Sequence, residues 1–247
     1  MLTGDLRSLF SAARAHPRLN QAAVEVLSSI SVDGITQQQQ LDSVLLYLLM
    51  HGKHVHSLDL ARAENVTVSL RDLPHNLHLD SLVLSNLTLQ MQPFAGRLGV
   101  VTMRHPNILH KQLRLSRCKL IDGIEGLAAA LALLPGLQHL SISGRGMAHM
   151  YLEYRGRFPT HVLPRLKKLT YLEIDDVTLQ GVPALQPVQG LNLLADLRLS
   201  VPNNAAVKRD MLSGLQHLTR LEVGGGVKLE ANVLFVATPK TGLIRPF

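Results

Sequence analysis

Cysteine, aromatic residues and long apolar runs are all scarce in this chain of 247 residues. Its one cysteine, Cys118, excludes a disulfide within the chain and fits a reducing compartment. The longest apolar runs, at 44–50 and 127–134, fall far short of the ~20 residues that a membrane-spanning helix needs. We therefore expect no membrane association and a cytoplasmic location, with the nucleus and the cytoskeleton or axoneme as alternatives.

Charged residues are also scarce, at 17% of the chain, against the roughly 25% that is usual for globular domains. The balance is nevertheless basic, with a net charge of +7, which raises nucleic acid as a partner. Lysine and arginine are scattered, however, and aromatic residues, which stack on bases, make up only 4% of the chain. We predict a mildly basic surface and do not expect nucleic acid as the partner.

Leucine is abundant, and it recurs in a triplet pattern, L-x-x-L-x-L. The central leucines recur every 24 to 32 residues, close to the about 20–29 residues of leucine-rich repeats. These seven positions are Leu58, Leu82, Leu113, Leu140, Leu172, Leu197 and Leu221. The two longest spacings contain insertions, at 92–106 and 144–159. Because side chains alternate along a strand, the second and third leucines of each triplet share one face, and the residues between them take the other.

The segment that connects one strand to the next is predicted to be helical where its apolar residues have helical spacing. The stripe before the fourth triplet consists of Ile124, Leu127, Ala128, Leu131 and Leu134. Pro135-Gly136 is expected to end that helix. One repeat cannot bury its apolar face alone, so neighbours must stack. The predicted fold is therefore α/β: a curved leucine-rich-repeat solenoid over residues 53–230, with parallel strands on the concave side and helices and loops on the convex side.

The best copy of the pattern, Leu113-Arg-Leu115-Ser-Arg-Cys118-Lys-Leu120, resembles the cysteine-type leucine-rich repeats of the ribonuclease-inhibitor and F-box families. The resemblance spans roughly residues 51–230. It implies that Cys118 takes the inward turn position after the strand. We therefore predict a small buried residue there rather than a reactive thiol, because Leu87 and Val177 occupy the same position in other copies.

Residues 1–52 lack the triplet and are predicted to be an all-helical N-terminal segment. A second helix is expected to run through Ile30, and a third to begin at a capping box of Thr36 with Gln39 and to end at Gly52. The expected buried face of the third helix is Leu41, Val44, Leu45, Leu48 and Leu49. This segment is interpreted as a cap on the open end of the solenoid, and residues 231–247 as a C-terminal tail or partial cap.

A second interpretation of the N-terminal segment rests on a resemblance. Asp5-Leu6-Arg7-Ser8-Leu9-Phe10, Ala13-Arg14, Leu19 and Ala22-Ala23 resemble the second half of an F-box. Together with the repeats, they are similar to the F-box leucine-rich-repeat proteins of plants and green algae. The Leu-Pro-x-Glu helix that opens that family's motif has no counterpart here, so the segment is a truncated F-box-like segment in this interpretation.

Patterns that could carry chemistry are better explained structurally. His51, His54 and His56 straddle a predicted helix end and strand start, so we expect solvated or capping histidines rather than a zinc site. The glycine clusters at 144–146 and 224–226 lack the context of a phosphate-binding loop and are predicted to be turns. We predict no enzyme activity, no catalytic residue, no cofactor and no metal.

The predicted function is protein–protein interaction on the concave face, with an unidentified protein as the partner. The third repeat offers basic residues there, the fifth offers acidic ones with Tyr171 as an anchor, and later repeats mix the signs. The candidate partner-binding residues are Lys111, Arg114, Arg117, Tyr171, Glu173, Asp175, Asp176, Arg198, Arg220 and Glu222. The alternative, implied by the F-box resemblance, is a substrate-recognition subunit of a cullin-based ubiquitin ligase. A ligase adaptor would then be a second partner if the F-box is complete upstream.

Overall fold

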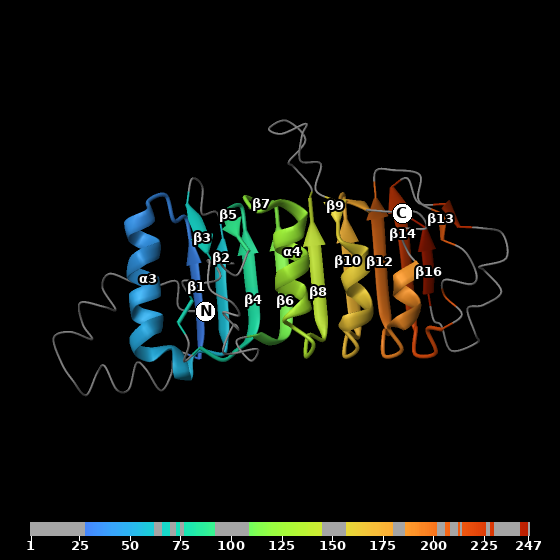
Figure 1. Cartoon of the computed structure of the whole chain (residues 1–247), viewed down its shortest axis with the longest axis horizontal. Coiled ribbons are helices and arrows are strands. Elements are labelled where there is room, and N and C mark those ends of the chain that lie inside the picture. Colours follow the sequence, from blue (N-terminus) through green and yellow to red (C-terminus); the bar gives the residue numbers. More distant parts are fainter. Residues whose placement is uncertain are drawn as a thin grey trace, which may run out of the picture.

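The computed structural model describes residues 28–61, 66–69, 73–74, 77–91, 109–144, 157–179, 186–201, 206–207, 212, 214–225, 228–229 and 243–246. Within these residues, nine strands form one long parallel sheet (Figure 1). In spatial order they are β1 (Ser29–Asp33), β2 (Ser57–Ala61), β4 (Leu79–Ser85), β6 (Leu109–Ser116), β8 (His139–Ser143), β10 (Tyr171–Asp175), β12 (Asp196–Val201), β14 (Arg220–Gly225) and β16 (Leu243–Pro246). Each strand lies beside the next one in this series, as stacking of successive repeats requires.

The strand register confirms the predicted repeats. The L-x-L part of all seven triplets falls on strands β2 to β14, and the central leucines pair directly from strand to strand, from Leu58 with Leu82 to Leu197 with Leu221. These leucines are buried, at no more than 6% exposure. Each fully buried leucine contributes about 1.5–3 kcal/mol relative to leaving it exposed, so the stacked leucine rows form the main core.

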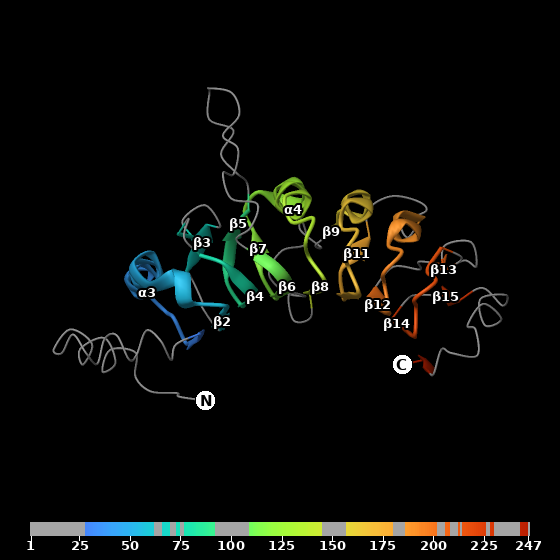
Figure 2. The same ribbon diagram turned by 90° about the horizontal axis from the view of Figure 1, so that it is seen from below.

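The outer side of the solenoid carries helices and short strands. Figure 2 shows the long sheet along the inner side of an arc and the helices along its outer side. The helices are α3 (Gln38–His51) and α4 (Gly123–Ala132), with the 3₁₀ helices η1 (Gly52–His54), η4 (Thr160–Arg165) and η5 (Gln186–Gly190). Three short parallel groups are made by β3 (Thr67–Ser69) with β5 (Thr88–Gln90) and β7 (Lys119–Leu120), by β9 (Arg157–Phe158) with β11 (Thr178–Leu179), and by β13 (Ala206–Val207) with β15 (Lys228–Leu229).

The predicted return helix before the fourth strand is confirmed as α4. Leu127, Ala128 and Leu131 are buried, and Leu134 packs against the same core. The helix ends at Ala132, just before the predicted Pro135-Gly136 stop. Together with the long parallel sheet, this arrangement is an α/β solenoid of the leucine-rich-repeat-like kind. In the part of the chain that is described, no helix is long and apolar enough to cross a membrane.

Several strands are followed directly by a residue in the left-handed backbone conformation. Gly34, Asn86, Arg117 and Asp176 all have positive φ, between 53° and 75°. The N–H groups of Asn86 and Arg117 donate to the carbonyls of Ser116 and Ser143 at 3.0 and 2.9 Å, which carries the ladder one step past each strand. The equivalent residue after β8 is Gly144, where an added Cβ would lie 2.4 Å from the carbonyl oxygen of Asp176. Only glycine fits there.

Cys118 follows the left-handed Arg117, and its predicted position is confirmed. It is partly buried against the core, while the equivalent Leu87 and Val177 are 4% and 6% exposed. The Cys118 thiol lies 3.2 Å from the carbonyl oxygen of Leu84, to which it can donate. Burial raises the pKa of this thiol to about 12, so it is protonated, and unreactive as a nucleophile, near neutral pH.

The N-terminal prediction needs correction. The all-helical segment is wrong at Ser29–Asp33, which forms β1 and pairs with β2, aligning Ile30 with Leu58 and Val32 with Leu60. Residues 29–33 alternate polar and apolar side chains, and pairing with an existing sheet outweighs the helical spacing read from the residues before them. Residues 1–27, which carry the F-box resemblance and the first predicted helix, lie outside the described residues.

The third predicted helix exists as α3, with two differences. It begins after Gln37 rather than Thr36, because the capping box is formed by Gln37 with Gln40 and not by Thr36 with Gln39. Its buried face includes Tyr47 in place of Leu49, which is 57% exposed. Its predicted end at Gly52 is confirmed.

Two further predictions concern residues that lie in the C-terminal strands β14 and β16. Gly224 and Gly225 do not form a turn, because β14 extends through them and pairs with Ser200 and Val201. Residues 243–246 of the predicted tail or partial cap add β16 to the edge of the sheet. The domain boundaries at 52/53 and 230/231 stay predictions. All of the first insertion, at 92–106, and residues 145–156 of the second, at 144–159, lie outside the described residues.

Candidate functional site

The residues of the long sheet that point away from the leucine core form what we call the inner face. Their order follows from the register, since each residue pairs with its equivalent on the next strand. The first row reads Ser57, Ser81, Gln112, His139, Tyr171, Asp196 and Arg220. The middle row reads Asp59, Val83, Arg114, Ser141, Glu173, Arg198 and Glu222. Residues far apart in sequence are thereby brought side by side.

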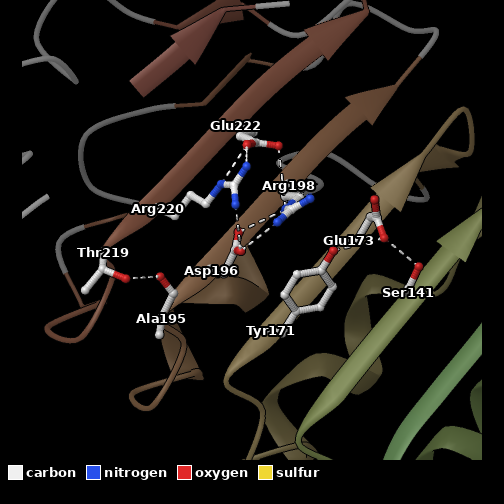
Figure 3. Close-up of polar contacts among 9 residues, drawn as sticks. All are labelled: Ser141, Tyr171, Glu173, Ala195, Asp196, Arg198, Thr219, Arg220 and Glu222. Carbon is white, nitrogen blue, oxygen red and sulfur yellow. Dashed lines mark hydrogen bonds and ion pairs between the residues drawn. The ribbon is translucent and has the colours of Figure 1, made fainter. Parts of the chain in front are cut away.

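Two arginines and two carboxylates form an ion-pair network on β12 and β14 (Figure 3). Arg198 donates from Nε and Nη2 to the two oxygens of Asp196, at 3.3 and 3.1 Å, and its Nε lies 3.5 Å from Oε2 of Glu222. Arg220 donates from Nε to Oε1 of Glu222 at 2.6 Å. Glu222 is only 4% exposed, so its charge depends on these two partners. The network is balanced in charge.

Tyr171 continues this network toward β8. Its hydroxyl donates to Oε2 of Glu173 at 3.1 Å, and the Ser141 hydroxyl donates to the same oxygen at 2.6 Å. One side of the ring stacks on His139, with centroids 5.8 Å apart, and the Arg198 guanidinium carbon lies 5.1 Å from the ring centroid. Burial, followed by the Glu173 charge, raises the pKa of Tyr171 to about 12. Tyr171 is thus a neutral, fixed hydrogen-bond donor.

Arg114 on β6 has different surroundings. Its neighbours in the middle row are Val83 and Ser141, which carry no charge. The Arg114 residue is exposed, and no carboxylate among the described residues forms an ion pair with it. Two strands away, burial and then the charge of Asp33 raise the pKa of Asp59, and Arg114 partly opposes that shift. Arg114 is therefore a cation whose own sheet neighbours do not neutralise it.

A shallow depression of about 380 Å³ lies between Arg114 and Tyr171. Its lining residues are Gln112, Leu113, Arg114, His139, Ser141, Tyr171 and Arg198. Ser141 is the small residue of the middle row between two larger ones, which leaves space above β8. No residue in this described lining is acidic, so hydrogen-bond donors and positive charge dominate the depression.

The predicted partner-binding residues are placed in three ways. Arg114, Tyr171, Glu173, Asp175, Arg198, Arg220 and Glu222 lie on strands at inner-face positions. Arg117 and Asp176 lie in the left-handed turns after β6 and β10, because strand alternation stops where the chain turns. Lys111 lies beside a shift in register between β4 and β6, where it forms an ion pair with Asp80 at 3.1 Å.

Sequence reasoning did not predict the burial of Glu222 and missed other residues of the inner face. Glu222 is 4% exposed, because the side chains of Arg198 and Arg220 lie against it. His139, Ser141 and Asp196 were not named, although all three take the outward positions of their strands. The alternation rule that selected Arg114 would also have selected them.

The histidines of 51–56 fall at the end of α3 and beyond it. His51 lies against Tyr47, with ring centroids 4.8 Å apart, and burial, followed by the charge of His54, lowers its pKa. Among the described residues, no group of three or more His, Cys, Asp or Glu side chains is placed to hold a metal ion.

Comparison with solved structures shows a distant structural likeness. An internalin from Listeria monocytogenes is 14% identical, with a TM-score of 0.30, over 92% of this chain and 88% of that chain. No family model matches the chain, and no curated protein matches it. The assignment to leucine-rich-repeat-like solenoids therefore rests on the register and leucine rows of this chain. Such solenoids generally present extended concave surfaces that bind proteins.

Proposed function

We propose that this chain is a protein–protein interaction module that binds its partner on the inner face. The observation that supports this most strongly is the continuous band of polar, aromatic and charged side chains from β6 to β14, beside a depression at β8. Tyrosine and arginine are enriched among the residues that dominate binding energy at interfaces. Both residue types occur here on a rigid sheet, so little conformational entropy is lost when a partner binds.

The network also favours recognition over simple solvation. Tyr171 is held by Glu173, His139 and Arg198, and Arg198 is held in turn by Asp196. Long side chains that are fixed before binding present one defined pattern of donors and acceptors. Such a surface selects partners through complementary charge, which mainly affects association rate and salt dependence.

Hydroxyl-radical footprinting tests this proposal directly. The full chain is used to capture a protein partner, and side-chain oxidation is compared with and without that partner. We expect oxidation of His139 and Tyr171 to fall several-fold in the complex. Met50 and Leu193, which are 58% and 46% exposed away from the inner face, serve as controls and should be unchanged. Protection of Met50 or Leu193 with no change at His139 and Tyr171 would overturn the proposal.

The ubiquitin-ligase role stays a prediction from sequence. It rests on the F-box resemblance of residues 5–23, which lie outside the described residues. Copurification of the full chain with a cullin adaptor would support that role, and binding to the inner face alone would not.

A further inference from the structure

We infer that the depression at β8 binds an aspartate or glutamate side chain of an acidic, extended segment of the partner protein, with Arg114 as its ion-pair partner. This inference rests on the proposed function and adds the chemistry of the segment that is bound. It follows from how charge is distributed along the middle row of the inner face, and from the shape and lining of the depression.

The middle row contains two arginines with opposite surroundings. Arg198 lies between Glu173 and Glu222 in register, and it also hydrogen-bonds Asp196. Arg114 lies between Val83 and Ser141, neither of which can neutralise it. The fold thus supplies carboxylates to one arginine and leaves the other to solvent. A carboxylate from the partner would give Arg114 the kind of pairing that Asp196 and Glu222 provide for Arg198.

The lining of the depression matches an anion better than a cation. Gln112, Arg114 and His139 all present N–H groups, and no residue of the described lining is acidic. The Ser141 hydroxyl already donates to Glu173, which keeps that carboxylate turned toward its own partners. A basic side chain placed here would meet Arg114 with no acidic residue in the lining to compensate. An acidic side chain would meet the positive charge of Arg114 and no carboxylate of the lining.

The dimensions suit one extended segment. Arg114 is on β6 and Tyr171 on β10, with β8 between them, so the walls stand about 10 Å apart at the usual strand spacing. Small Ser141 forms the floor. The wall on the β10 side is already rigid, because Tyr171 is stacked on His139 and bonded to Glu173. A segment that crosses the strands can therefore place one carboxylate at Arg114 and the next side chain against His139.

A selection experiment with defined probes tests the inference. A library of random dodecapeptides is displayed and selected on the full chain, on Arg114→Glu and on Lys168→Glu. Lys168 is an exposed lysine in the turn before β10, so its reversal makes the same change in net charge away from the inner face. Thermal melting of each variant checks that it is folded. We expect wild-type and Lys168→Glu to enrich aspartate and glutamate, and Arg114→Glu to lose that enrichment.

Synthetic peptides then give the affinity and the source of the carboxylate. A selected acidic peptide should bind Arg114→Glu at least about tenfold more weakly than wild-type. Its C-terminal amide should bind as well as the free acid, because a side-chain carboxylate carries the contact. Replacing the glutamates by glutamine should weaken binding to wild-type and strengthen binding to Arg114→Glu, where it relieves repulsion between carboxylates. Loss of binding on amidation alone would overturn the side-chain assignment.

A blocking variant separates failure of the inference from failure of the proposed function. Gln112→Trp fills the depression without changing charge. Peptides that lose binding to Gln112→Trp but show no acidic bias would leave the inner face as the binding surface and overturn the acidic segment. Peptides insensitive to both Gln112→Trp and Arg114→Glu would overturn both. Tighter, Arg114-dependent binding of a single-stranded oligonucleotide than of any peptide would overturn a protein ligand in favour of nucleic acid.

Discussion

Between β1 and β6 the inner face carries mainly small side chains, whereas from β8 to β14 it carries a linked set of rings, carboxylates and guanidinium groups. Both regions lie on the same backbone ladder and above the same leucine rows. The difference shows that the repeat determines which residues form the core, whereas the residue types at the outward positions can vary. In the second region charges are neutralised by their neighbours, as at Arg198, and in the first region Arg114 is not.

The two regions should depend equally on their core. Leu82 and Leu172 are 2% and 0% exposed and hold equivalent positions in β4 and β10. Leu82→Ala and Leu172→Ala should each lower the free energy of unfolding by about 2–5 kcal/mol, because each leaves a cavity between repeats. Urea denaturation measures this. Losses under about 0.5 kcal/mol for both would contradict the strand register.

The network of the second region should make its face sensitive to loss of charge. Glu222→Gln removes the charge that faces Arg198 and Arg220, and it should cost about 1–3 kcal/mol. The cost is limited because those arginines keep 29% and 43% side-chain exposure. The matched change in the first region, Arg114→Gln, should stay within about 0.5 kcal/mol. Equal effects of the two changes in thermal unfolding would remove the distinction between the regions.

The turns that follow the strands provide a finer comparison. Arg117 has φ of 54°, whereas the turns after β4, β10 and β1 use Asn86, Asp176 and Gly34, which tolerate this conformation better. Arg117→Gly should raise stability, or leave it unchanged, within about 1 kcal/mol, and Arg117→Val should lower it by about 1 kcal/mol. Ser116→Gly, one residue earlier in regular strand, is the control and should lower stability. Stabilisation by Arg117→Val would contradict the left-handed turn.

Cys118 is expected to have the smallest effect. Cys118→Val copies the equivalent Val177 and should change stability by less than about 1 kcal/mol. The native thiol should react slowly with a thiol reagent at pH 8, because burial raises its pKa from 9.0 to about 12. The unfolded chain loses this proton first, so stability should fall as pH rises from about 9 toward 12. Cys118→Val should lessen that fall; rapid native labelling would contradict the burial.

The repeat and the strand faces could be predicted because their signals are local and repeated. Seven leucine triplets fix strand positions, and alternation then tells which residues point outward. Strand β1 was not predicted, because Ile30 and Val32 alternate with polar residues over only five positions. The residues before them have the apolar spacing of a helix. The burial of Glu222 could not be read from the sequence, since it depends on side chains of Arg198 and Arg220 meeting across two strands.

The depression at β8 also required the structure. It depends on a serine standing between an arginine and a fixed tyrosine on three successive strands. The residues concerned are separated by 27 or more positions in sequence, from Arg114 to Ser141 and on to Tyr171. The leucine triplets align Arg114 with Ser141, but only the structure shows that Tyr171 is fixed by Glu173 and His139 and that space remains above Ser141.

The most direct measurement is the dissociation constant of a captured protein partner for two variants of the full chain. Tyr171→Ala removes the ring at the centre of the inner face, and the double variant Lys167→Glu with Lys168→Glu reverses charge in an exposed turn outside it. Binding on the inner face predicts that Tyr171→Ala weakens the complex by about 1–3 kcal/mol, while the double variant changes it little. Loss of binding in the double variant, with wild-type affinity in Tyr171→Ala, would contradict binding on the inner face.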